Sequence, residues 1–159
     1  MNRLEKAAAA AAPAAALAAS LVRRHKKSDP EQVLRSYYDA WAEGDADAVR
    51  DLLADDYCGH VHTLSGTEDQ DADELAERVE GHATAFDQVE YDVEDVIAAD
   101  GRVAARVTMR ASHRETGKEA ETAGLVILRV DTGRIAEEWS SWDYLGLAEQ
   151  LGLSEGASS

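Results

Sequence analysis

The sequence predicts an α+β domain in which helices come first along the chain and an antiparallel sheet follows. Apolar residues recur at helical spacing between residues 33 and 41. Between residues 103 and 111 every second residue is apolar, which is the pattern of a half-buried strand. Extended segments separated by Asp-Gly and Thr-Gly turns fill the second half. Helices on one face of a curved sheet would leave a cavity between the two layers.

Composition and charge limit the possible partners. The 159 residues suffice for one domain, and the single Cys58, expected as a small buried residue, excludes an intramolecular disulfide. Residues 1–28 carry six Lys or Arg and one Glu, whereas residues 29–159 carry ten basic and 31 acidic residues. So acidic a domain would repel nucleic acid and anionic membranes. Residues 29–159 contain a single lysine, Lys118, and many acidic residues, which favours a halophilic source. A GC-rich genome is the alternative, because it also favours arginine over lysine.

The two ends of the chain are expected to lie outside the domain. Ala7–Val22 is rich in alanine but shorter than the roughly 20 residues that a spanning helix needs. The basic cluster Arg23–Lys27 opposes export, so we expect residues 1–28 to be a disordered tail of a cytoplasmic protein. A signal peptide is the alternative. Residues 153–159 are expected to be a flexible tail, which leaves residues 29–152 as the domain.

Two helices should open the domain. Asp29 can cap the first, with Pro30 at its first position, and Gly44 ends it. The second begins at Asp45 and ends near residues 55–56. We then expect a short extended stretch over Tyr57–Thr63, a polar loop from 65 to 71, and a third helix over Asp73–Phe86.

Four extended segments and a helical turn complete the domain. The strands are expected over residues 89–97, 102–111, 121–130 and 135–142, and the turn over Tyr144–Leu151, closing on Gly152. Trp139 and Trp142 should face opposite sides of the last strand. The segment Gly124–Val130 is apolar on both faces, so its outer face needs a second cover. A homodimer would provide it.

Two stretches resemble the SnoaL-like polyketide cyclases of the nuclear-transport-factor-2-like superfamily. One is the opening pattern Y-x-x-W-x-x-G-D-x-D-A-V-x-x-L-L-A-D-D-Y, from Tyr38 to Tyr57. The other is the ending W-D-Y-L-G-L-x-x-Q-L-G, from Trp142 to Gly152. The resemblance covers about residues 30–152 and implies a cone-shaped curved sheet that wraps the helices around an apolar pocket, usually in a dimer.

The resemblance also implies a departure from the family's chemistry. The position of the cyclases' acid–base aspartate falls at Ser140, and that of a pocket histidine falls at Val126. Serine cannot perform the same proton transfer, and valine cannot donate a hydrogen bond to an enolate. Asp143 matches a second family aspartate, which is not the one assigned to the chemistry.

Two histidines are candidates for acid–base chemistry. His60 and His62 are two residues apart on an extended segment, so both imidazoles should point to the same side, at the mouth of the cavity. The alternative is that they are solvated or bonded to Asp55 or Asp56. No carboxylate lies at a typical ligand spacing from this pair, although Asp143 could join it, so we predict no metal and no cofactor.

Two carboxylates complete the catalytic candidates. Asp143 lies beside Trp142, where partial desolvation would raise its pKa; it could equally be a cap on the helical turn. Glu137 and Glu138 face opposite sides of the strand, so one of them should face inward, and Glu138 is a reserve candidate behind the two histidines and Asp143. Residues expected to line the pocket are Tyr37, Trp41, Tyr57, Phe86, Met109, Val126, Trp139, Ser140 and Trp142.

These observations predict a small-molecule pocket and leave its chemistry open. One hypothesis is an acid–base enzyme of cyclase or isomerase type that acts on a small polyketide-like or cyclic molecule. The other is a non-catalytic ligand-binding or dimeric interaction module on the same fold.

Overall fold

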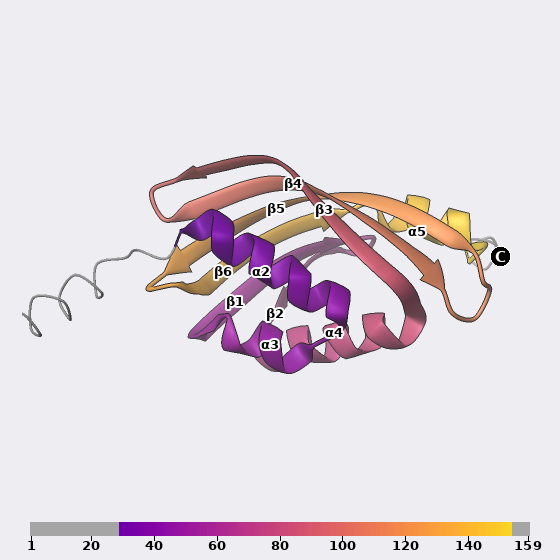
Figure 1. Ribbon diagram of the computed structural model, residues 1–159, viewed down its shortest axis with the longest axis horizontal. Helices are drawn as coiled ribbons and strands as arrows, with labels where there is room; N and C mark the ends of the chain where they lie inside the picture. Colours follow the sequence, from indigo (N-terminus) through magenta and orange to yellow (C-terminus); the bar gives the residue numbers. More distant parts are fainter. Residues whose placement is uncertain (1–28, 154–159) are drawn as a thin grey trace, which may run out of the picture.

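The computed structural model describes residues 29–153, which form helices packed against one curved sheet (Figure 1). The expected tail over residues 1–28 and all but the first residue of the expected C-terminal tail lie outside the described residues. The elements in chain order are α2 (Pro30–Glu43), α3 (Ala46–Asp51), β1 (Leu53–Thr63), β2 (Gly66–Gln70), α4 (Ala72–Ala85), β3 (Phe86–Ala99), β4 (Arg102–His113), β5 (Glu119–Asp131), β6 (Arg134–Trp142) and α5 (Tyr144–Leu151).

The helices begin at acidic caps that the sequence supplies. The Asp29 carboxylate accepts a hydrogen bond from the amide of Glu31 at 3.1 Å and begins α2. Asp71 and Glu74 form a capping box at the start of α4, with each side chain accepting a backbone amide at 2.9 Å. These caps fix where α2 and α4 begin, and so which of their residues face the sheet.

The sheet has six strands in the order β2-β1-β6-β5-β4-β3. All neighbours are antiparallel except β1 and β6, which run parallel. This pairing places Gly59 beside Glu138 and His60 beside Trp139. The expected antiparallel sheet is therefore correct for four of the five pairings, and the parallel pair joins the first long strand to the last.

One expected helix end and one expected loop are wrong. The second helix ends at Asp51 instead of near residues 55–56, because β1 already begins at Leu53 and pairs with β6. Residues 66–70 are the edge strand β2 and not a polar loop. Antiparallel pairing with β1, from Thr63↔Gly66 to Gly59↔Gln70, holds this polar segment extended, and an edge strand needs few apolar residues.

The hydrophobic core lies between α2, α3 and α4 and the concave face of the sheet. Its completely buried members include Leu34, Val49, Leu75 and Val79 from the helices, and Val103, Val107, Leu128 and Ile135 from the strands. No helix within residues 29–153 has the length and apolarity needed to cross a membrane.

Candidate active site

A pocket opens between the helices and the concave face of the sheet, with a cavity of about 140 Å³. Its walls are mainly aromatic, and they come from α2, α4, α5 and all six strands of the sheet. The residues with rings are Tyr37, Tyr38, Trp41, His82, Tyr91, Trp142 and Tyr144, and the other polar residues are Gln70, Arg78, Thr122, Glu138 and Ser140.

Glu138 is the buried carboxylate of this pocket. It lies on β6 with 4% of its surface exposed. Its Oε2 accepts hydrogen bonds from the hydroxyls of Tyr37 and Tyr57, each at 2.9 Å. The amide nitrogen of Gln70 donates in turn to the Tyr57 hydroxyl at 3.3 Å. Hydroxyl donors from α2 and β1 therefore converge on one oxygen of this carboxyl group, and Gln70 of β2 supports the second donor.

A glycine makes this convergence possible. Gly59 is the register partner of Glu138 on β1. A Cβ at this position would lie 2.5 Å from the Tyr57 hydroxyl and 2.8 Å from the side chain of Gln70. Any side chain here would displace the hydrogen-bond network, so the absence of a Cβ gives Tyr57 and Gln70 their space.

Burial raises the pKa of the Glu138 carboxyl, because the ionised form loses its hydration. The hydroxyls of Tyr37, Tyr57 and Ser140 favour the carboxylate and oppose this rise. The pKa of Tyr37 and Tyr57 is also raised, primarily by burial, so both phenols stay protonated as donors. The group can thus be a base with a proton affinity above that of a surface glutamate.

His82 is a second titratable group of the pocket. Burial lowers its pKa to about 4, so the imidazole is neutral at neutral pH. Its Nε2 lies 3.1 Å from the sulfur of Met109 and 3.4 Å from the hydroxyl of Tyr91. The ring packs edge-on against Trp41 at 5.5 Å. A neutral imidazole enclosed by rings contributes to a largely apolar wall.

Three buried side-chain atoms within residues 29–153 have no hydrogen-bond partner: Trp41 Nε1, Gln70 Oε1 and His82 Nδ1. All three belong to residues that line the pocket. Most buried polar atoms in proteins are paired, so an unpaired one needs an explanation such as strain, a catalytic role or a bound water or ion. Their grouping marks this pocket as the place where a polar ligand would be accommodated.

The two candidate histidines lie on the other side of the sheet, so their expected position at the cavity is wrong. They do share one face, as their spacing predicted. However, Tyr57 and Val61 of β1 are buried on the concave side, and strand alternation then directs His60 and His62 outward. Neither histidine lines the pocket.

Trp139 and Asp143 also lie outside the pocket lining. Trp139 faces outward and stacks on the ring of His60 at 5.4 Å, whereas Trp142 lines the pocket, which confirms that the two indoles face opposite sides. The Asp143 carboxylate caps α5 and accepts a hydrogen bond from the amide of Gly146 at 2.8 Å. The capping alternative for Asp143 is the one that the structure shows.

The remaining candidates divide between wall and core. Glu138, Tyr37, Trp41, Met109, Ser140 and Trp142 line the cavity. Three expected members do not: Tyr57 lies behind Glu138, Phe86 packs against His82 at 5.0 Å, and Val126 belongs to the core. Gln70, Arg78, His82 and Tyr144 also line the pocket and were not predicted from the sequence. A signal for His82 existed, because it shares the apolar face of its helix with Leu75 and Val79.

Comparison with known proteins agrees with this architecture. The profile of the SnoaL-like polyketide cyclase family matches residues 31–151. IdmH, described as a putative polyketide cyclase from Streptomyces antibioticus, is 26% identical, with a TM-score of 0.69 over 77% of this chain and 98% of that chain. A Catenulispora acidiphila protein with a ketosteroid isomerase-like fold, solved with trimethylamine, is 13% identical, with a TM-score of 0.68 over 80% of this chain and 97% of that chain. No curated protein matches the chain.

Proposed function

Because the chain belongs to the SnoaL-like polyketide cyclase family, we propose that it is an acid–base enzyme of cyclase or isomerase type in which Glu138 transfers the proton. One observation carries this proposal: Glu138 is a buried carboxyl in the wall of an aromatic pocket, held by two tyrosine hydroxyls. Among the four catalytic candidates, it is the one that lines the cavity.

The proposed step moves a proton within a bound ligand. Tyr37 and Tyr57 both bind Oε2, which leaves Oε1 free of them to take a proton from a carbon next to a carbonyl group. The protonated Glu138 then returns the proton to another atom of the resulting enolate. A positioned acid–base group of this kind accelerates a reaction by roughly 10²–10⁴-fold. Ser140, at the family's aspartate position, lies two residues further along the same face of β6, so Glu138 would replace that aspartate from a neighbouring position.

The pocket fits a small cyclic ligand. A cavity of about 140 Å³ is close to the size, about 150 Å³, that holds a benzene molecule in an engineered protein core. One six-membered ring, or one ring of a larger molecule that extends into solvent, would therefore occupy it. Apolar rings would contact the ligand's faces, and Glu138, Ser140 and Gln70 would contact its polar edge.

A ligand-binding module without catalysis is the second candidate. The observation in its favour is Ser140, which cannot perform the proton transfer of the aspartate that it replaces. The two candidates share the pocket and differ in whether Glu138 exchanges protons with the ligand.

The proposed assembly is a homodimer that uses the convex face of the sheet. Leu125 is 64% exposed and Ile127 is 43% exposed, and both lie on this face of β5. Two large apolar side chains two residues apart form a patch that a second copy would cover. We further propose a cytoplasmic location, because the basic cluster Arg23–Lys27 opposes export, and adaptation to salt, because residues 29–159 are strongly acidic and contain one lysine.

Proton exchange tests the function without knowledge of the product. The chain is incubated in D₂O with a panel of one-ring ketones and 1,3-diketones, and deuterium at the α-carbon is followed by NMR. We expect incorporation by the native chain and a loss of about 10²–10⁴-fold in Glu138→Gln. Glu119→Gln, which changes an exposed glutamate of β5, is the control. Ligands that bind without exchange would favour the binding module.

A further inference from the structure

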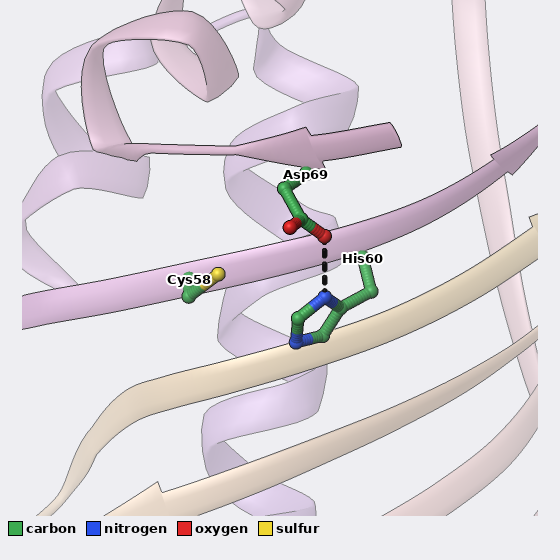
Figure 2. A group of neighbouring side chains, drawn as sticks. All are labelled: Cys58, His60 and Asp69. Atoms are coloured by element: carbon green, nitrogen blue, oxygen red, sulfur yellow. Dashed lines mark hydrogen bonds and ion pairs between the residues drawn. The ribbon is translucent and has the colours of Figure 1, made fainter. Parts of the chain in front are cut away.

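We propose that Cys58, His60 and Asp69 form a binding site for a divalent transition-metal ion, with a donor set that fits zinc. The three side chains lie on the convex side of the sheet, apart from the pocket (Figure 2). One sulfur, one imidazole nitrogen and one carboxylate oxygen lie within 4.8 Å of one another. The site is independent of the proposed catalytic role of Glu138.

Strand geometry brings the three ligands together. Cys58 and His60 are two residues apart on β1, so their side chains leave the same face. Asp69 lies directly opposite His60 in the antiparallel pairing of β1 and β2. Figure 2 shows the Asp69 carboxylate reaching the imidazole from the neighbouring strand, with the sulfur of Cys58 beside them. The sequence alone did not indicate this set, because Asp69 was expected in a loop and lies instead on β2.

The spacing suits a tetrahedral ion after a small adjustment. Zinc bonds of about 2.0–2.3 Å hold their donor atoms about 3.3–3.8 Å apart. Nδ1 of His60 lies 2.7 Å from Oδ1 of Asp69, where the two atoms share a proton. A metal ion would replace that proton and increase the distance between the two atoms by less than about 1 Å. The sulfur of Cys58 would move toward the ion. Three protein ligands would leave the fourth position to water.

The surroundings of His60 match those of a metal-binding imidazole. Its second nitrogen, Nε2, lies 3.0 Å from the carboxylate of Glu137, which is itself held by Arg129 at 3.1 Å. With a metal on Nδ1, Nε2 carries the proton and donates to Glu137, the arrangement that orients most metal-binding histidines. Trp139 stacks on the ring at 5.4 Å and fixes its plane.

The donor types select the kind of metal. A thiolate and an imidazole together favour zinc and its neighbours in the first transition row, whereas magnesium and calcium take oxygen ligands. His60 is 24% exposed, so an ion can reach it from solvent. The net charge of −16 attracts cations to the surface in general, so the test must separate this site from diffuse binding.

Cobalt titration of the full chain, freed of metal by a chelator, tests the site. We expect one Co²⁺ per chain, a thiolate-to-cobalt absorption band in the near ultraviolet, and loss of that band when Zn²⁺ is added. Excess Mg²⁺ should not displace the cobalt. Zinc should also raise the midpoint of thermal unfolding, because it binds the folded chain and joins β2 to β1. Absence of the band in the native chain would overturn the proposal.

Variants assign the ligands through zinc affinity, measured by calorimetry. Cys58→Ser, His60→Gln and Asp69→Asn should each weaken binding by at least tenfold, and Glu137→Gln by roughly 10–100-fold with the cobalt band retained. His62→Gln, on the same face of β1 but outside the set, is the matched control and should bind as the native chain does. Equal affinity in all variants would show diffuse binding to acidic groups and overturn the assignment. Circular dichroism checks that each variant is folded.

Discussion

The hydroxyl of Tyr37, on the first described helix, donates a 2.9 Å hydrogen bond to Glu138 on the last strand. The two residues are 101 positions apart, and both are almost completely buried. The bond fixes an ionisable group at the base of the pocket, where the two layers of the domain meet. The proposed function and the stability of the fold therefore depend on the same carboxyl group.

Replacing Glu138 should separate stability from activity. The pKa of Glu138 is raised in the folded chain, so between about pH 4.5 and this raised value the folded state binds more protons than the unfolded state. Stability should then fall as the pH rises through this window. Glu138→Gln removes this decrease in stability with pH, so the variant should be more stable than the native chain at neutral pH by about 1 kcal/mol. Its proton exchange with the ligand should be lost. Urea unfolding from pH 4 to 8 measures the stability, and a variant less stable at every pH would contradict the prediction.

Tyr37→Phe should move the pH dependence of proton exchange. Loss of one donor leaves the carboxylate less stabilised, so the pKa of Glu138 rises and the acidic limb of the rate profile shifts to higher pH. We also expect a loss of about 1 kcal/mol in unfolding free energy. Tyr38→Phe removes a hydroxyl from the adjacent ring, which is not one of the two tyrosine hydroxyls that donate to Glu138, and should leave the limb in place. Equal shifts in both variants would argue against a specific role of the Tyr37 hydroxyl.

His82 should make the domain less stable in mild acid. Its pKa falls from 6.5 to about 4 on folding, so in this range the unfolded state binds more protons and stability rises with pH. The contribution is complete above pH 6.5 and decreases toward pH 4, by at most about 3 kcal/mol. In His82→Gln this part of the pH dependence of the unfolding free energy should disappear. Denaturant unfolding at a series of pH values measures it. His62→Gln, a change at an exposed imidazole, is the control.

Gly124→Ala should disturb the pocket through Trp142. A Cβ at this position would lie 2.4 Å from the indole ring, which lines the cavity. The ring would have to move, at a cost of about 1–3 kcal/mol. Gly81→Ala is the matched control, because a Cβ there meets nothing within 4 Å, and in the middle of α4 it should stabilise the chain by up to about 1 kcal/mol. Thermal unfolding of the two variants should shift in opposite directions.

Leu125→Asp should dissociate the proposed homodimer. The charge would lie in the convex apolar patch, so sedimentation at micromolar concentration should show a monomer for the variant and a dimer for the native chain. Leu145→Asp introduces the same change at an exposed leucine of α5 and should remain dimeric. The comparison is made in dilute buffer and in molar salt, since salt screens the repulsion between two acidic copies. A native monomer in both solvents would end the dimer proposal.

The order and type of the long elements could be predicted from the sequence, because each carries its own periodicity. The period-two pattern of β4 and the opposite directions of Glu137 and Glu138 on β6 are two such cases, and the structure confirms both. Periodicity also showed that His60 and His62 share a face. It could not show which face, because that depends on the burial of Tyr57 and Val61, which point to the opposite face of the same strand.

The missed features depend on pairing between distant segments. The edge strand β2 has little apolar pattern of its own and is held by β1. The buried position of Glu138 requires hydroxyls from α2 and β1, which no local pattern connects to β6. Asp69 meets His60 only through the same strand pairing. The candidate sites therefore follow from the tertiary structure and not from sequence motifs.

The parallel pairing of β1 with β6 has a consequence for biosynthesis. β6 lies between β1 and β5, so the sheet is divided into two parts until the last strand is in place. A ribosome-bound chain that has not yet released residues 134–142 exposes the unpaired edges of β1 and β5. Contacts of such long sequence separation form slowly, and open strand edges promote aggregation. The domain can therefore complete its folding only after β6 has left the ribosome, and chains truncated before β6 should be substrates for chaperones and proteases.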